Sequence, residues 1–248
     1  MNLVRLKIKR QDSDVAAPYW EYFEVAADPF MTVVSALRAL RKRPVNMEGR
    51  AVAPVLWDCQ CLEKKCGSCT MVVNKRVRLA CTTLLEGLTQ PVTLEPLSKF
   101  PVIRDLVVDR KKDIDNQKRL HLWPAVDGFD AGYGALQLYK KNNLADAVVR
   151  CIDCGACLEA CPQYHLSADF VGAKILAQVY RLHVCVNGRA EDGLRFNQLN
   201  NPGGVHDCDN IQNCVRVCPL DIPMADAIAQ IKRQVLWHTV KGFFMEDQ

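Results

Sequence analysis

Thirteen cysteines in a chain of 248 residues are the side chains best able to do chemistry in this protein. Thiolates bind soft transition metals, form disulfides or act as nucleophiles, and their spacing helps to decide among these uses. The first ten residues, MNLVRLKIKR, alternate apolar and basic side chains and lack the apolar core of a secretory signal. We therefore expect a reducing compartment, where clustered cysteines more often hold metal than form disulfides.

The first cysteine group is Cys61-x4-Cys66-x2-Cys69, followed after eleven residues by Cys81. Plant-type ferredoxins hold a 2Fe–2S cluster with this spacing. Gly67 would let the loop curve tightly, so that backbone N–H groups face the cluster sulfurs. The alternative is structural zinc, but zinc ligands usually come as two short C-x2–4-C pairs. The spacing therefore predicts a 2Fe–2S site with these four cysteines as ligands.

The second group is the run Cys151-x2-Cys154-x2-Cys157-x3-Cys161-Pro162. This is the bacterial ferredoxin pattern, in which three cysteines hold one cubane cluster and the fourth ligates a second cluster. The run therefore predicts a second copy elsewhere in the chain.

That second copy is CDNIQNCVRVCP, from Cys208 to Pro219, and Ile211 stands where its second cysteine would be. Isoleucine offers no lone pair, and Asp209 lies two positions from that corner, in the wrong place to substitute. If the last cysteine of each run ligates the other cluster, one cluster has four thiolates and the other has three. Three thiolates suit a 3Fe–4S cluster. A 4Fe–4S cluster with one labile iron is the alternative for the second site. The predicted 4Fe–4S ligands are Cys151, Cys154, Cys157 and Cys218, and the predicted 3Fe–4S ligands are Cys161, Cys208 and Cys214.

Two cysteines remain outside these sets. Cys59 could be a buried thiol, a substitute ligand or a redox-sensitive surface group, and an inert small hydrophobe is the favoured interpretation. Cys185 ends a predicted helix, and we expect it to be a core thiol.

The first hundred residues have the pattern of a small mixed domain. Alternation from Val4 to Ile8 predicts a half-buried strand, and Phe23 with Val25 predicts its partner. Asp28 before Pro29 predicts a helix cap, with a helix over Phe30–Arg43. A hairpin is expected at 71–79 around Asn74–Lys75, and a closing strand at Val92–Glu95. Together these elements favour a β-grasp ferredoxin domain over residues 1–105.

The remainder of the chain has a helical pattern, and residues 106–248 are expected to form an all-α ferredoxin domain. The charged segment Asp105–Leu120 is interpreted as the connection between domains, with the run Asp109–Asp115 on a solvated surface. Helices are predicted over Gly134–Arg150, Ala168–Leu182 and Pro223–Val240. The last of these, with Trp237, Phe243 and Phe244, could dock on a membrane anchor or complete the domain's own core.

Composition limits the other function classes. A net charge of +4 with 24% charged residues is too mild for a strong nucleic-acid binder. No stretch approaches the roughly 18 apolar residues that a membrane span needs. We therefore expect no nucleic-acid partner, and membrane contact only through another protein.

The order of the sites and the motifs CGSC at Cys66–Cys69 and DCDNIQNCVRVCP at Asp207–Pro219 resemble the iron–sulfur subunit of succinate dehydrogenase and fumarate reductase. The resemblance covers nearly the whole chain and implies an α+β protein, with a β-grasp 2Fe–2S domain before an α-helical ferredoxin domain. It implies a subunit that relays single electrons between a flavoprotein with covalent FAD, where succinate and fumarate interconvert, and a quinone-binding membrane anchor. It also implies a peripheral position on the cytoplasmic face of the membrane, with no residue of this chain acting on substrate carbon.

The sequence departs from many relatives after Pro162, where Gln163–Leu166 contains no tryptophan, and Asp209 stands where some relatives have histidine. These departures put a ubiquinone pocket in doubt and favour menaquinone and an anchor carrying haem b. His165 lacks a converging ligand set and is expected at the surface.

The cysteine patterns leave two alternative functions. One is a subunit of a thiol-dependent fumarate reductase or a heterodisulfide-reductase-like enzyme, whose relatives append Cys-Cys-Gly motifs that are absent here. The other is a zinc-stabilised binding module, which would be colourless where an iron–sulfur protein is brown.

Overall fold

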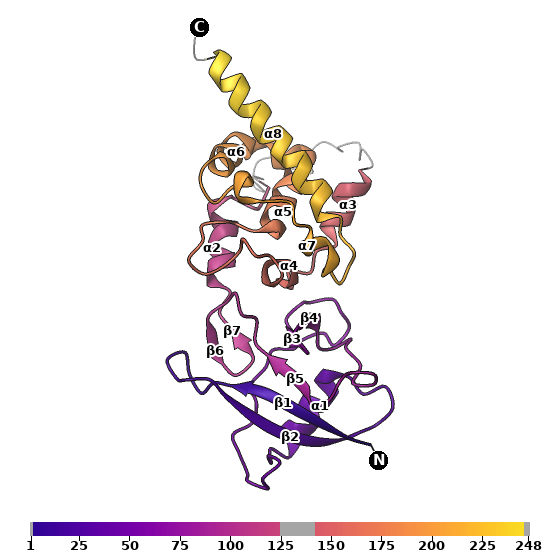
Figure 1. Cartoon of the computed structure of the whole chain (residues 1–248). Coiled ribbons are helices and arrows are strands. Elements are labelled where there is room, and N and C mark those ends of the chain that lie inside the picture. Colours follow the sequence, from indigo (N-terminus) through magenta and orange to yellow (C-terminus); the bar gives the residue numbers. More distant parts are fainter. Residues whose placement is uncertain (1, 125–141, 246–248) are drawn as a thin grey trace, which may run out of the picture. The chain divides into compact units, whose positions relative to one another are not determined.

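The structure, a computed structural model, describes residues 2–124 and 142–245. The chain divides into two compact units (Figure 1). The first comprises Met1–Arg110 and Ile152–Glu159, and the second comprises Lys111–Cys151 and Ala160–Gln248. A short segment of the second cysteine run thus belongs to the unit that also contains the first cysteine group.

A five-stranded mixed sheet forms the centre of the first unit, in the order β2-β1-β5-β3-β4. The strands are β1 (Asn2–Arg10), β2 (Tyr19–Ala27), β3 (Thr70–Val73), β4 (Arg76–Leu79) and β5 (Val92–Glu95). β1 runs parallel to β5 and antiparallel to β2. The alternating residues Val4, Leu6 and Ile8 are buried, which confirms the predicted strand and its inward face. A separate two-stranded ribbon, β6 (Val102–Arg104) and β7 (Val107–Val108), follows the sheet.

The helix of the first unit begins later than the sequence predicts. α1 spans Val33–Lys42 and buries Val34, Leu37 and Leu40. Its N-cap is Thr32, whose side chain accepts a hydrogen bond from the Ser35 N–H at 3.2 Å. Phe30 lies in the left-handed region at φ 64°, so the chain cannot yet be helical there. The predicted cap at Asp28 is therefore wrong, because the threonine hydroxyl satisfies the end of the helix instead.

The predicted hairpin is confirmed, with Asn74 and Lys75 forming its turn at φ 47° and 63°. Both central residues of a type I′ hairpin turn have positive φ, and asparagine tolerates this conformation well. The Asn74 side chain also accepts a hydrogen bond from the Thr93 N–H of β5 at 2.7 Å. The turn therefore fastens the hairpin to the neighbouring strand.

The second unit is helical, as predicted. Its elements are α2 (Lys111–Arg119), α3 (Asn143–Val149), α5 (Ala173–Val184), 3₁₀ helix η1 (Val186–Glu191), α6 (Asp192–Asn200), 3₁₀ helix η2 (Val205–Asp207), α7 (Asn213–Arg216) and α8 (Met224–Met245). The α5 and α8 helices pack together through buried aliphatic side chains that include Ile175, Val179, Ile228 and Ile231. The expected helix at Gly134–Arg150 is seen only from Asn143, where Asn142 caps it, and residues 134–141 lie outside the described residues.

Two expectations for the second unit are wrong. The charged segment Asp109–Asp115 is not all solvated, because Asp113 is buried and forms an ion pair with the equally buried Lys174. Its Lys111–Asp115 part forms the first turns of helix α2. Cys185 is exposed rather than a core thiol, because it lies beyond the last turn of α5 in an extended conformation.

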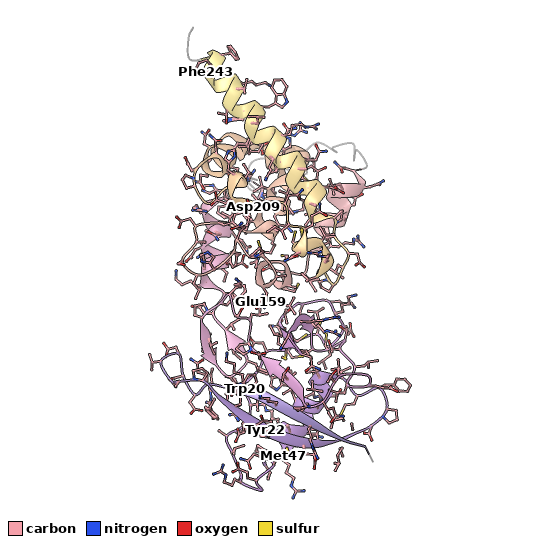
Figure 2. The ribbon with its side chains drawn as sticks, viewed as in Figure 1. Trp20, Tyr22, Met47, Glu159, Asp209 and Phe243 are labelled. Carbon is pink, nitrogen blue, oxygen red and sulfur yellow. The ribbon has the colours of Figure 1, made fainter. Side chains whose placement is uncertain are left out.

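The C-terminal half of α8 extends past the other helices of its unit (Figure 1). Trp237, Phe243 and Phe244 on this half are 57%, 72% and 70% exposed, so they do not complete the core of the domain. Figure 2 shows Phe243 near the end of the helix. Within the described ranges, no helix is both long and apolar enough to span a membrane.

Candidate iron–sulfur sites

The first cysteine group converges in the first unit because the hairpin brings its two ends together. Cys69 lies directly before β3, and Cys81 lies two residues after the end of β4. The Ala80 N–H donates to the Cys69 carbonyl at 3.1 Å, so the two cysteines lie beside each other across the hairpin. Both side chains are buried, at 2% and 8% exposure. Cys61 and Cys66 come from the loop that precedes β3 and are half-buried.

The loop from Cys61 to Cys69 is curved by three residues in the left-handed region, Leu62, Lys64 and Gly67. This curvature turns backbone N–H groups toward sulfur. The N–H groups of Glu63 and Lys65 both donate to Cys61 Sγ at 3.3 Å. Such hydrogen bonds stabilise the negative charge that a thiolate ligand carries and tune the potential of a bound cluster.

The four sulfurs form two pairs. Burial raises the pKa of Cys66, but hydrogen bonds with the Ser68 side chain and with Cys61 outweigh it and lower the pKa to about 6. The Ser68 hydroxyl lies 3.0 Å from Cys66 Sγ. Burial, together with the adjacent Cys81 thiol, raises the pKa of Cys69 to about 12. Cys61 is thus paired with Cys66, and Cys69 with Cys81, which fits two irons that each take two cysteine ligands.

Part of the second cysteine run packs directly against this loop within the first unit. A Cβ atom added to Gly67 would lie 2.6 Å from the Ile152 carbonyl oxygen and 2.7 Å from Cys154 Cα. Gly67 also has φ 69°. Glycine is therefore needed both for the turn and for the close approach of the two cysteine loops.

Several contacts hold the Ile152–Glu159 segment in this position. Glu159, in helix α4 (Ala156–Glu159), accepts hydrogen bonds from the Ser98 hydroxyl at 2.7 Å and from the Lys99 N–H at 3.1 Å. Figure 2 labels Glu159. Arg110 donates to the Asp153 carbonyl at 2.9 Å. Cys154 and Cys157 are both buried there, while Cys151 and Cys218 belong to the second unit.

A cavity in the second unit is lined by the three cysteines of the predicted three-thiolate site. The cavity is partly open to solvent. Its lining contains Cys161, Cys208 and Cys214 together with the apolar side chains of Phe170, Ile211 and Ile228. Burial raises the pKa of Cys214, and the neighbouring thiols of Cys208 and Cys161 raise it further. The structure thus brings three thiols together beside an aliphatic residue.

Contacts from distant parts of the second unit shape this cavity. Lys232 of α8 donates to the Cys208 carbonyl at 2.5 Å, and Asn213 donates to the Ala160 carbonyl at 2.9 Å. Asp209, which Figure 2 labels, lies at the cavity lining. It is exposed and accepts a hydrogen bond from Gln163. Outside this cavity, the Ile222 N–H faces Cys218 Sγ at 3.5 Å.

The sequence indicated the cysteines themselves, but it did not indicate the residues that hold them in place. Ser68 could have been noticed from its place inside the CGSC motif. Lys232 gives no such signal, because it lies 24 residues from Cys208 and reaches it only through the packing of α8. His165 is exposed, as expected. Across residues 2–124 and 142–245, no three His, Cys, Asp or Glu side chains lie close enough together to hold a single metal ion.

Comparison with known proteins finds iron–sulfur domains over the same parts of the chain. Residues 5–115 match the family model of a 2Fe-2S iron-sulfur cluster binding domain, and residues 147–222 match that of a 4Fe-4S dicluster domain. The succinate dehydrogenase iron-sulfur subunit of Bacillus subtilis is 39% identical over 246 residues, covering 99% of this chain and 97% of that protein. This chain belongs to the family of succinate dehydrogenase and fumarate reductase iron–sulfur subunits.

Other members of the family agree. The fumarate reductase iron-sulfur subunit of Escherichia coli O6:H1 is 32% identical over 243 residues, covering 94% of this chain and 93% of that protein. A chain of the Mycobacterium smegmatis Sdh1 complex has the same fold, with a TM-score of 0.68 at 24% identity over 94% of this chain and 95% of that one.

Family membership makes this chain an electron-relay subunit of an oxidoreductase. The two family models also confirm the predicted fold class, a 2Fe–2S domain followed by a helical dicluster domain. The alternatives of a heterodisulfide-reductase-like subunit and a zinc module are not favoured by these findings.

Proposed function

We propose that this subunit carries three iron–sulfur clusters along one electron path. The 2Fe–2S cluster is held by Cys61, Cys66, Cys69 and Cys81. The 4Fe–4S cluster is held by Cys151, Cys154, Cys157 and Cys218. The 3Fe–4S cluster is held by Cys161, Cys208 and Cys214.

The observation that carries the three-cluster proposal is the cavity in the second unit. Three thiols line it, and Ile211 supplies an aliphatic side chain where a fourth ligand would be needed for a complete cubane. Asp209 also lines the cavity, but its carboxylate is engaged by Gln163. The donor set is therefore three sulfurs, which fits 3Fe–4S better than 4Fe–4S.

For the first two sites, support comes from the contact between the loops of Gly67 and Cys154. A path for electrons needs neighbouring carriers at short range, and this contact places ligands of the 2Fe–2S and 4Fe–4S sites on touching segments of one unit. When bound, the clusters accept and release one electron at a time. The protein holds the sulfurs, directs N–H groups at them and buries Cys69, Cys81, Cys154 and Cys157 away from water.

The partners follow from family membership. One partner is a flavoprotein subunit, with covalent FAD, where succinate and fumarate interconvert. The other is a quinone-binding membrane anchor, and the lack of tryptophan after Pro162 favours menaquinone and an anchor carrying haem b. The subunit is then peripheral on the cytoplasmic face of the membrane, attached through the anchor. The exposed apolar end of α8, with Trp237, Phe243 and Phe244, is a surface suited to that contact.

Electron paramagnetic resonance of the complex tests the three-cluster assignment. The oxidised wild-type complex should give a 3Fe–4S signal. Ile211→Cys supplies the missing thiolate and should abolish this signal as a fourth iron binds. Asp209→Asn is the matched control, because it changes a neighbouring side chain without adding sulfur, and the signal should persist. A wild-type complex without the signal, or an unchanged signal in Ile211→Cys, would contradict the assignment.

A further inference from the structure

A positive charge lies beside one of the proposed 4Fe–4S ligands in the first unit. Arg110 follows the β6–β7 ribbon, and its guanidinium nitrogen Nη1 donates to the Asp153 carbonyl at 2.9 Å. A Cβ atom added to Gly155 would lie 3.4 Å from the same nitrogen. Asp153 and Gly155 are the two neighbours of Cys154 in the chain. The guanidinium therefore lies against the backbone on both sides of this cysteine.

The position of the Arg110 side chain is fixed from two directions. The Asp109 N–H donates to the Pro101 carbonyl at 2.8 Å, which ties the chain next to Arg110 to the residue before β6. The guanidinium also lies over the ring of Phe100, 5.8 Å from its centroid, and Phe100 is buried. An arginine can stack on an aromatic ring while its N–H groups donate in the guanidinium plane, so these contacts together favour one arrangement.

The loop around Cys154 needs such support. Asp153 and Gly155 have φ 57° and 78°, both in the left-handed region, and the loop forms neither helix nor strand there. This conformation costs free energy for a residue other than glycine, and it persists where surrounding contacts hold it. The hydrogen bond from Arg110 to the Asp153 carbonyl is one such contact. Arg110 thus helps to hold the backbone that carries Cys154.

The charge of Arg110 also matters for a bound cluster. Arginine stays protonated throughout the ordinary pH range, and the contacts described above are with a neutral carbonyl and an aromatic ring. Cys154 is buried and Arg110 is half-buried, so water and salt screen this charge less than they screen a fully exposed one. A reduced cluster carries one more negative charge than an oxidised cluster, so a nearby cation stabilises the reduced form.

We propose that Arg110 is a positioning residue for the 4Fe–4S cluster, which holds the loop around Cys154 and raises the midpoint potential of the cluster through its positive charge. This inference rests on the proposed 4Fe–4S site. Arg110 makes the arrival of an electron at that site more favourable and does not itself accept or donate one. A neutral donor at position 110 would keep the loop contact and lose the effect on the potential, whereas lysine would keep the charge.

Redox titration of the full chain in its complex, purified without air and followed by electron paramagnetic resonance, tests this proposal. Arg110→Gln keeps a donor for the Asp153 carbonyl but removes the charge. At the wild-type midpoint potential, its ratio of reduced to oxidised 4Fe–4S cluster should be at least tenfold lower, which corresponds to about 59 mV for one electron. Arg110→Lys should stay within threefold of the wild type. The matched control is Arg5→Met, which removes an exposed charge of the same unit and should also stay within threefold.

The content of 4Fe–4S cluster per complex gives a second readout. Arg110→Met removes both the donor and the charge and should keep less than half of the wild-type content, whereas Arg110→Gln and Arg110→Lys should keep most of it. The proposal is overturned if Arg110→Gln titrates within threefold of the wild type or assembles no cluster. It is also overturned if Arg110→Lys or Arg5→Met falls as far as Arg110→Gln, or if Arg110→Met keeps its full content. A wild-type complex with no reduced 4Fe–4S signal would instead overturn the proposed function.

Discussion

Loss of Arg10 should destabilise the backbone segment that leads into the first cysteine loop. Its guanidinium is 1% exposed and donates to Asp105 at 2.7 Å, to Glu21 at 2.6 Å and to the Ala53 carbonyl at 3.0 Å. Asp105 is fully buried and also accepts from the Leu56 N–H at 2.8 Å. Arg10 and Asp105 therefore anchor the backbone just before the loop that carries Cys59, Cys61 and Cys66.

The expected cost of Arg10→Met can be worked from this geometry. Removing one partner of a buried ion pair leaves the other charge without compensation and costs about 3 to 5 kcal/mol. With a urea m-value of about 2 kcal/mol/M, this lowers the unfolding midpoint by roughly 1.5 to 2.5 M. Arg5, on the same strand, is the matched control. Its pair with Glu24 at 3.5 Å is largely exposed, so Arg5→Met should cost at most about 1 kcal/mol.

Urea unfolding of the full chain under nitrogen, followed by far-ultraviolet circular dichroism, measures both midpoints. Bleaching of the visible absorbance gives the rate of cluster loss, which should rise only in Arg10→Met. The double variant Arg10→Met/Asp105→Leu should recover at least half of the lost stability, because the fully buried charge of Asp105 is removed together with its partner. If Arg10→Met shifts the midpoint no more than Arg5→Met, the anchoring role given to this buried pair is wrong.

Three further predictions follow from other contacts. Gly67→Ala should disturb the 2Fe–2S and 4Fe–4S resonance signals, because its Cβ would collide with Ile152 and Cys154. Gly49→Ala is the control: Gly49 has a similar positive φ but no neighbour within 4 Å, so this variant should leave both signals intact. Lys174→Met should lower stability by about 3 to 5 kcal/mol in urea unfolding, because it breaks a buried pair with Asp113. Lys111→Met, which breaks an exposed pair with Asp115, should leave the unfolding midpoint nearly unchanged. Removal of Gly242–Gln248 should weaken co-purification with a membrane protein, and unchanged association would contradict docking through the end of α8.

The two cysteine patterns show how much the spacing of residues in the sequence can predict. The family models place 2Fe–2S and dicluster domains where the two cysteine patterns predict them. Spacing is informative here because cluster ligands come largely from single short loops, where sequence separation limits the distance between sulfurs. The β3–β4 hairpin was predictable for the same local reason, since two adjacent residues form its turn.

Local patterns failed where the deciding partner was distant or where two local signals competed. Asp28 and Thr32 are both acceptable helix caps, and only the folded backbone, with Phe30 left-handed, selects Thr32. The charge of Asp113 predicts exposure, but Lys174, 61 residues away, lets it be buried.

The sequence by itself determined the order of the two iron–sulfur domains and most strands and helices, because spacing and periodicity act over a few residues. Only the tertiary structure decided that Gly67 touches Cys154 and that Arg10 and Asp105 anchor the first loop. Both contacts join residues about 90 positions apart in the chain. Such contacts are set by packing and burial across the whole unit, which short-range patterns do not encode.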